Sequence, residues 1–101
     1  MIHVIAQITL KPGCRSDFLA EFHQLVPLVH AEQGCLEYGP AIDAATPIDA
    51  QVTDENLVVV VEKWESVSHL EAHLVADHMQ TYREKVKEMV GGTSLQILSP
   101  A

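Results

Sequence analysis

The segment Leu57–Trp64 constrains the fold more than any other part of the chain, because it is apolar on both faces of an extended strand. Side chains alternate between the two faces of a strand. One face carries three aliphatic side chains, those of Leu57, Val59 and Val61. The other carries two valines, then a carboxylate and an indole: Val58, Val60, Glu62 and Trp64. A strand with two apolar faces must be covered on both sides.

Hydrophobic periodicity predicts the elements around this strand. Three further strands are expected, at residues 3–10, 35–42 and 94–98. In the second of them, Leu36, Tyr38 and Ile42 are expected to share one face. Helices are expected at residues 16–32, 66–75 and 77–90. Residues 43–55 show no hydrophobic periodicity and are expected to form a long loop, of the kind that often serves as a lid or binding segment.

The ends of these helices have recognisable signals. Ser66 can cap the second helix, and Asp77 followed by Gln80 has the spacing of a capping box for the third. The pair Gly91–Gly92 is expected to stop the third helix. The resulting order, βαββαβ, predicts one α+β domain over residues 1–101 with the ferredoxin-like arrangement.

In that arrangement the helices cover one face of an antiparallel sheet, so the face with Leu57, Val59 and Val61 stays open. The simplest cover is the sheet of a second copy in an isologous homodimer. Composition agrees, because 48% of residues are apolar and only 20% are charged, against about 25% charged in typical domains. A small chain has much surface for its volume and should be more polar than average.

The charge balance excludes several partners. Six Lys and Arg against 14 Asp and Glu give a net charge of −8, which does not suit nucleic acid or an anionic membrane surface. No apolar run approaches the roughly 20 residues that span a bilayer. The N-terminal segment has no basic region before its apolar stretch, so we expect a cytoplasmic protein with Cys14 and Cys35 as free thiols.

Three of the six histidines lie within ten residues. His69 and His73 are four apart and share a helix face, which could bind a metal. No third ligand stands at a telling spacing, and we therefore expect no metal. His73 and His78 would diverge on one straight helix. The helix break at Asp77 could let them converge on a cavity; otherwise they are core or surface histidines.

Glu62 and Trp64 continue the apolar face of their strand. A buried carboxylate is costly unless it is paired or used. Glu62 either forms a salt bridge with Arg83 or Lys85, or lines a pocket with its pKa raised by burial. Trp64 is expected to form an aromatic wall of that pocket.

Tyr38 and Tyr82 could each add a phenolic donor to such a pocket, or pack in the core with the hydroxyl satisfied. Met79 lies on the same helical stripe as Tyr82. No Gly-rich nucleotide loop, phosphate loop or nucleophile elbow is present in the sequence. The sequence therefore offers no cradle for a nucleotide or flavin.

An ordered set of short segments resembles the antibiotic biosynthesis monooxygenase family, and most closely its bacterial quinol monooxygenase branch. The segments are residues 32–38 (EQGCLEY), 38–43 (YGPAID), 62–66 (EKWES), 69–73 (HLEAH) and 77–79 (DHM). The likeness extends from the first strand to Pro100. It implies a ferredoxin-like fold that dimerises through its sheets and has one cavity per subunit between sheet and helices.

The resemblance also implies oxidation of quinols or related hydroxylated aromatics by O₂ without metal, haem or flavin, because the substrate itself supplies the electrons. On this basis His73 or His78 is the expected base and Trp64 the aromatic wall. Tyr38 and Tyr82 are candidate donors, Met79 a pocket residue, and Glu62 an orienting or alternative acid. A haem-degrading activity is disfavoured, because Gln7 stands near the strand position where that branch has Asn. The alternatives are a non-catalytic quinone-binding dimer and a small-molecule isomerase of the same fold.

Overall fold

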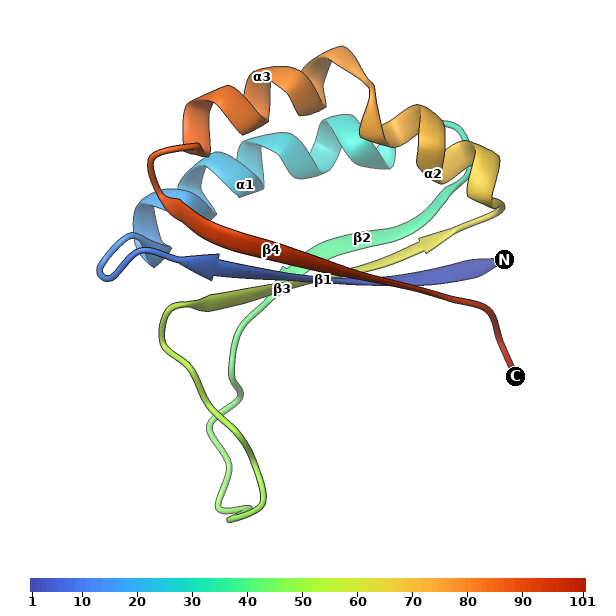
Figure 1. Ribbon diagram of the computed structural model, residues 1–101. Coiled ribbons are helices and arrows are strands. Elements are labelled where there is room, and N and C mark those ends of the chain that lie inside the picture. The colour runs from blue at the N-terminus through green and yellow to red at the C-terminus, as the bar shows by residue number, and fades with distance from the viewer.

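The computed structural model describes all 101 residues and contains one four-stranded antiparallel sheet with three helices on one face (Figure 1). Along the chain the elements are β1 (Ile2–Leu10), α1 (Arg15–His30), β2 (Cys35–Ala41), β3 (Leu57–Trp64), α2 (Val67–Leu74), α3 (Asp77–Val86) and β4 (Val90–Leu98). The strand order is β2-β3-β1-β4. The predicted ferredoxin-like βαββαβ fold is confirmed, with its second helical segment divided into α2 and α3.

The core lies between the sheet and the helices. In β3 every second residue is buried, and these are the two valines, the carboxylate and the indole that share one predicted face: Val58, Val60, Glu62 and Trp64. The main helix α1 covers them with Phe18, Phe22, Leu25 and Val29, all at most 3% exposed. Burial of each such side chain contributes about 1.5–3 kcal/mol, so this packing holds the helices on the sheet.

The helix signals give mixed results. Ser66 caps α2 as predicted, since its hydroxyl accepts a hydrogen bond from the backbone N–H of His69 at 3.3 Å. Asp77 does not cap α3, because the N-cap residue is Ala76 and Asp77 is the first helical residue. Its carboxylate instead lies in the first turn, where the helix dipole favours negative charge.

Two predicted boundaries near the C-terminus are wrong. The third helix, α3, ends at Val86 and not at residue 90, and the last strand, β4, begins at Val90 and not at residue 94. The pair Gly91–Gly92 therefore lies in the strand and does not stop the helix. The register of β4 against β1 shifts between Thr9 and Leu10. The backbone N–H and C=O groups at the end of β1 need hydrogen-bond partners, and the early start of β4 supplies them. Gly91 and Gly92 lie at the shift in register, where glycine tolerates the local bend of the strand.

The predicted face of β2 is also wrong in part. Its register against β3 shifts between Cys35 and Glu37. Tyr38 therefore points into the core at 5% exposure, whereas Leu36 is 52% exposed. Ile42 falls outside the strand and is also exposed.

Residues 42–56 connect β2 to β3 as an arm without regular structure, as the lack of periodicity predicts. The arm extends away from the sheet on the side opposite to the helices (Figure 1). It is held by its own polar contacts, such as the 2.8 Å hydrogen bond that Gln51 Nε2 donates to the Ala44 carbonyl. Within one chain the arm thus does not cover the helical side of the sheet.

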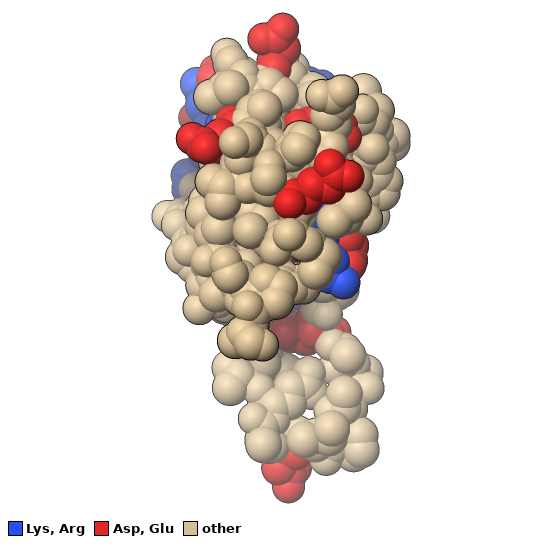
Figure 2. Space-filling model, turned by 90° about the vertical axis from the view of Figure 1, so that its right-hand side faces the viewer, with Lys and Arg blue, Asp and Glu red and all other residues tan.

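On the face seen in Figure 2, Asp and Glu side chains are spread over the surface and Lys and Arg are few. No basic patch gathers there to attract a polyanion. No helix combines the length and apolar character needed to cross a bilayer.

Candidate active site

A cavity of about 280 Å³ lies between the helices and the sheet. Most of its lining is apolar or aromatic, and its polar groups come from Tyr38, Glu62, His73, Tyr82, Arg83 and Thr93. Five of the seven predicted site residues line it: Tyr38, Glu62, His73, Met79 and Tyr82. An apolar slot with a few converging polar groups suits a small aromatic molecule.

Trp64 lies directly behind this lining. Its ring centroid is 4.7 Å from that of His73, and its Nε1–H donates a 2.9 Å hydrogen bond to Glu62 Oε1. Trp64 is fully buried. It therefore supports two cavity residues from behind, a role that differs from the direct wall predicted from the sequence.

Glu62 has an unusual environment for a carboxylate, since it is only 5% exposed. Burial raises its pKa to about 7, the Trp64 hydrogen bond opposes this rise, and the negative charge of Glu32 adds to it. The predicted alternative of a salt bridge is wrong. Arg83 donates to the Leu74 carbonyl at 2.6 Å, and Lys85 lies 3.9 Å from Glu21.

His73 on α2 is 1% exposed. Burial lowers its pKa, although the hydrogen bond and charge of Glu32 partly offset the effect. Its Nδ1 lies 2.8 Å from Glu32 Oε2 and, as the N–H tautomer, donates to that carboxylate. The other ring nitrogen, Nε2, makes no hydrogen bond within the chain. A neutral imidazole held in this way presents a free lone pair and can act as a base.

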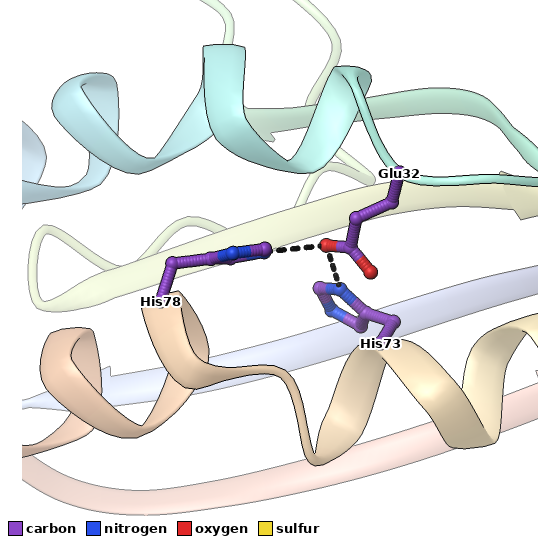
Figure 3. Close-up of side chains that lie close together, drawn as sticks. All are labelled: Glu32, His73 and His78. Carbon is purple, nitrogen blue, oxygen red and sulfur yellow. Dashed lines mark hydrogen bonds and ion pairs between the residues drawn. The ribbon is translucent and has the colours of Figure 1, made fainter.

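His78 meets His73 at the same carboxylate oxygen (Figure 3). Its Nε2 lies 2.8 Å from Glu32 Oε2, although it comes from α3. The break between α2 and α3, which lies just before Asp77, lets the two imidazoles converge on this one oxygen. His69 does not take part, because its Nδ1 bonds to Ser66 Oγ at 2.7 Å.

Glu32 is the site residue that sequence reasoning missed. It follows α1 in the turn before β2, and is 41 and 46 positions away from its two histidines. Gly34 shapes this turn with φ +78°, where a Cβ would also collide with the ring of His69. The only feature near Glu32 that marks it in the sequence is its place two residues before Gly34. This feature does not indicate that its partners are His73 and His78.

Glu32, His73 and His78 could also hold a metal ion. Each offers one ligand atom, and the three atoms lie within 4.8 Å of one another. Two imidazoles and one carboxylate suit a first-row divalent ion. Their mutual hydrogen bonds already satisfy these atoms, so the cluster is also complete without an ion.

The two tyrosines stay neutral in this environment. Burial raises the pKa of Tyr38 and of Tyr82 far above physiological pH. Tyr38 stacks on Phe22 with ring centroids 5.5 Å apart, and Tyr82 meets Phe22 edge-on at 5.7 Å. Both phenols can therefore donate a hydrogen bond into a cavity with aromatic walls.

A small ferredoxin-like domain with an apolar cavity, a buried imidazole and phenolic donors defines a class of small-molecule enzymes rather than one enzyme. The family model described as antibiotic biosynthesis monooxygenase matches residues 1–85. The chain thus belongs to the antibiotic biosynthesis monooxygenase family, and the resemblance seen in its segments is confirmed.

Individual relatives agree with this assignment. The chain is 41% identical over 102 residues to a protein of Escherichia coli named "Probable quinol monooxygenase YgiN", covering 99% of this chain and 98% of that one. Its fold matches PA3566 from Pseudomonas aeruginosa, with a TM-score of 0.82 and 25% identity over 99% of this chain and 93% of that one. It also matches Rv0793 from Mycobacterium tuberculosis, with a TM-score of 0.81 and 26% identity over 99% and 94% of the two chains.

Proposed function

We propose that this chain is a monooxygenase that oxidises quinols or related hydroxylated aromatics with O₂ and needs no cofactor. The observation that carries the proposal is His73, a buried imidazole that holds one nitrogen on Glu32 and leaves the other free in an aromatic cavity. The full-length similarity to a protein named as a quinol monooxygenase supports the substrate class.

The chemistry begins with removal of a proton. His73 Nε2 takes the proton of a substrate hydroxyl, and the electron-rich anion passes one electron to O₂. The resulting semiquinone and superoxide combine through a new C–O bond, and loss of water gives a hydroxyquinone. One quinol and one O₂ thus yield one hydroxyquinone and one water, with the substrate as the source of all electrons.

The remaining polar groups stabilise the charges that develop. Tyr38 and Tyr82 donate hydrogen bonds toward the oxygen atoms that become negative. Glu62, with a pKa near neutrality, orients the substrate or returns a proton late in the reaction. The apolar walls exclude water, which strengthens these interactions.

We further propose that the active form is a homodimer that packs sheet against sheet. The face of the sheet opposite to the helices carries the half-buried side chains of Ile5, Leu57, Val59 and Val61, and no helix of the chain covers it (Figure 1). An apolar sheet face of this kind needs a cover. A sedimentation mass twice that of one chain at micromolar concentration supports the dimer, and a single-chain mass contradicts it.

The activity is tested with the metal-free protein and a reduced naphthoquinol. Saturable O₂ uptake above the autoxidation background is the expected result. Trp64 is the single tryptophan and reports binding through its fluorescence. Saturable quenching of Trp64 without faster O₂ uptake overturns the enzyme and leaves a quinone-binding protein.

A further inference from the structure

We propose that Glu32 and His78 form a proton relay between His73 in the cavity and a groove on the surface. This inference rests on the proposed function, since it gives the route for the proton that His73 removes from the substrate. Neither Glu32 nor His78 lines the cavity, so their part in the reaction is to act through His73.

The relay is continuous at a single atom. His73 Nδ1 and His78 Nε2 both lie 2.8 Å from Glu32 Oε2 (Figure 3). A proton that reaches this oxygen from one imidazole already lies within hydrogen-bond distance of the other. The carboxylate does not have to rotate, as it would if the histidines bonded to different oxygens.

Exposure rises along the same three side chains. The side chain of His73 is 2% exposed, that of Glu32 14%, and that of His78 26%. A cluster that only supported the packing would not need side-chain exposure to rise from one member to the next. The order buried base, half-way carboxylate and partly exposed imidazole is what a path to solvent requires.

The outer end of the path is a groove of about 320 Å³ that involves α1 and α3. His78 lines this groove together with charged Glu21 and Lys85, whereas His73 lines only the cavity. Tyr82 lines both spaces and forms part of the wall between them. The three-residue cluster is thus a polar connection between two spaces on either side of an aromatic wall.

The transfer balances proton by proton. In the state that passes a proton outward, Glu32 Oε2 carries a proton that it donates to His78 Nε2, and the same oxygen accepts a hydrogen bond from His73 Nδ1–H. When His73 Nε2 gains the substrate proton, Nδ1 releases its own to Oε2 as the proton already on Oε2 moves to His78 Nε2. His78 then releases a proton from Nδ1 to water in the groove. The reverse sequence returns one proton to the cavity when water forms from the reduced oxygen, so the cycle ends with no net release.

Two variants of His78 separate relay from support. His78→Gln keeps an amide N–H that can bond to Glu32 but cannot pass a proton on. We expect its kcat to fall by about tenfold or more with KM and Trp64 quenching unchanged. His78→Ala should lose as much, and added imidazole should restore its kcat while an inert salt of equal ionic strength does not. His23→Gln changes an exposed histidine outside the site and serves as the matched control.

Wild-type kcat in His78→Gln overturns the relay, as does a loss in His78→Ala that imidazole leaves unchanged. The proposed function fails separately, if the wild-type protein itself does not accelerate O₂ uptake. In that case the relay is still tested by NMR of the ring nitrogens. Protonation of His73 should change the tautomer or charge of His78 in the wild type and not in Glu32→Gln, and independent titration of the two rings overturns it.

Discussion

Replacing Glu62 by Gln tests the electrostatics of the cavity most directly. Glu62 is the one carboxylate of the chain that is buried, at 5% exposure. In Glu62→Gln the side-chain oxygen can still accept the hydrogen bond from Trp64 Nε1. The substitution therefore removes the titration and retains the shape and the main contact.

The magnitude follows from the pKa. Burial raises the pKa of Glu62 from 4.5 to about 7, and each pKa unit corresponds to about 1.4 kcal/mol. Between these two values the folded protein binds more protons at Glu62 than the unfolded chain does. The free energy of unfolding of the wild type therefore falls as pH rises through this window, by up to about 3 kcal/mol from this group. Glu62→Gln does not have this loss.

The assay is urea unfolding, followed by circular dichroism and Trp64 fluorescence at fixed protein concentration. The stability of Glu62→Gln relative to wild type should rise from below pH 4.5 to above pH 7 and then level off. The control Glu71→Gln, an exposed carboxylate on α2, should show no such rise. A difference for Glu62→Gln that is independent of pH, or that shrinks as pH rises, refutes the reasoning.

Three further predictions follow from the site and the sheet. His73→Gln should lower kcat by about 100-fold or more while Trp64 quenching by the quinone persists; if Glu62→Gln loses the activity instead, Glu62 is the base. Exhaustive treatment with a chelator should leave O₂ uptake unchanged, and a loss restored by one divalent ion would assign the Glu32, His73 and His78 cluster to a metal. Val59→Lys on the open sheet face should halve the sedimentation mass without loss of helix content, and an unchanged mass contradicts the sheet-to-sheet dimer.

The fold could be predicted because the two central strands, β1 and β3, alternate between buried and more exposed residues. In β3 the alternation of valines with Glu62 and Trp64 fixes both the strand and the side that meets the helices. Where one extra residue shifts the register, the pattern misleads. Tyr38 turns inward and Leu36 outward because of the irregularity between Cys35 and Glu37, which depends on pairing with β3 and leaves no trace in β2 alone.

The site was predictable only where local spacing reflects it. His73 and His78 stand on either side of a helix break, and their convergence can be considered from the sequence. Their common partner Glu32 is brought to them by the packing of α1 against α3 and by the turn at Gly34. Such a contact across more than forty positions has no signature in a single sequence.

The most direct test of the central claim is the fate of oxygen atoms in a single-turnover reaction. Metal-free protein is given a reduced naphthoquinol and isotope-labelled O₂, and the product is analysed by mass spectrometry with His73→Gln as the parallel sample. We expect one labelled oxygen atom in each product molecule from the wild type, and product only at the autoxidation level from His73→Gln. Wild-type product without label, or equal labelled product in both samples, contradicts it.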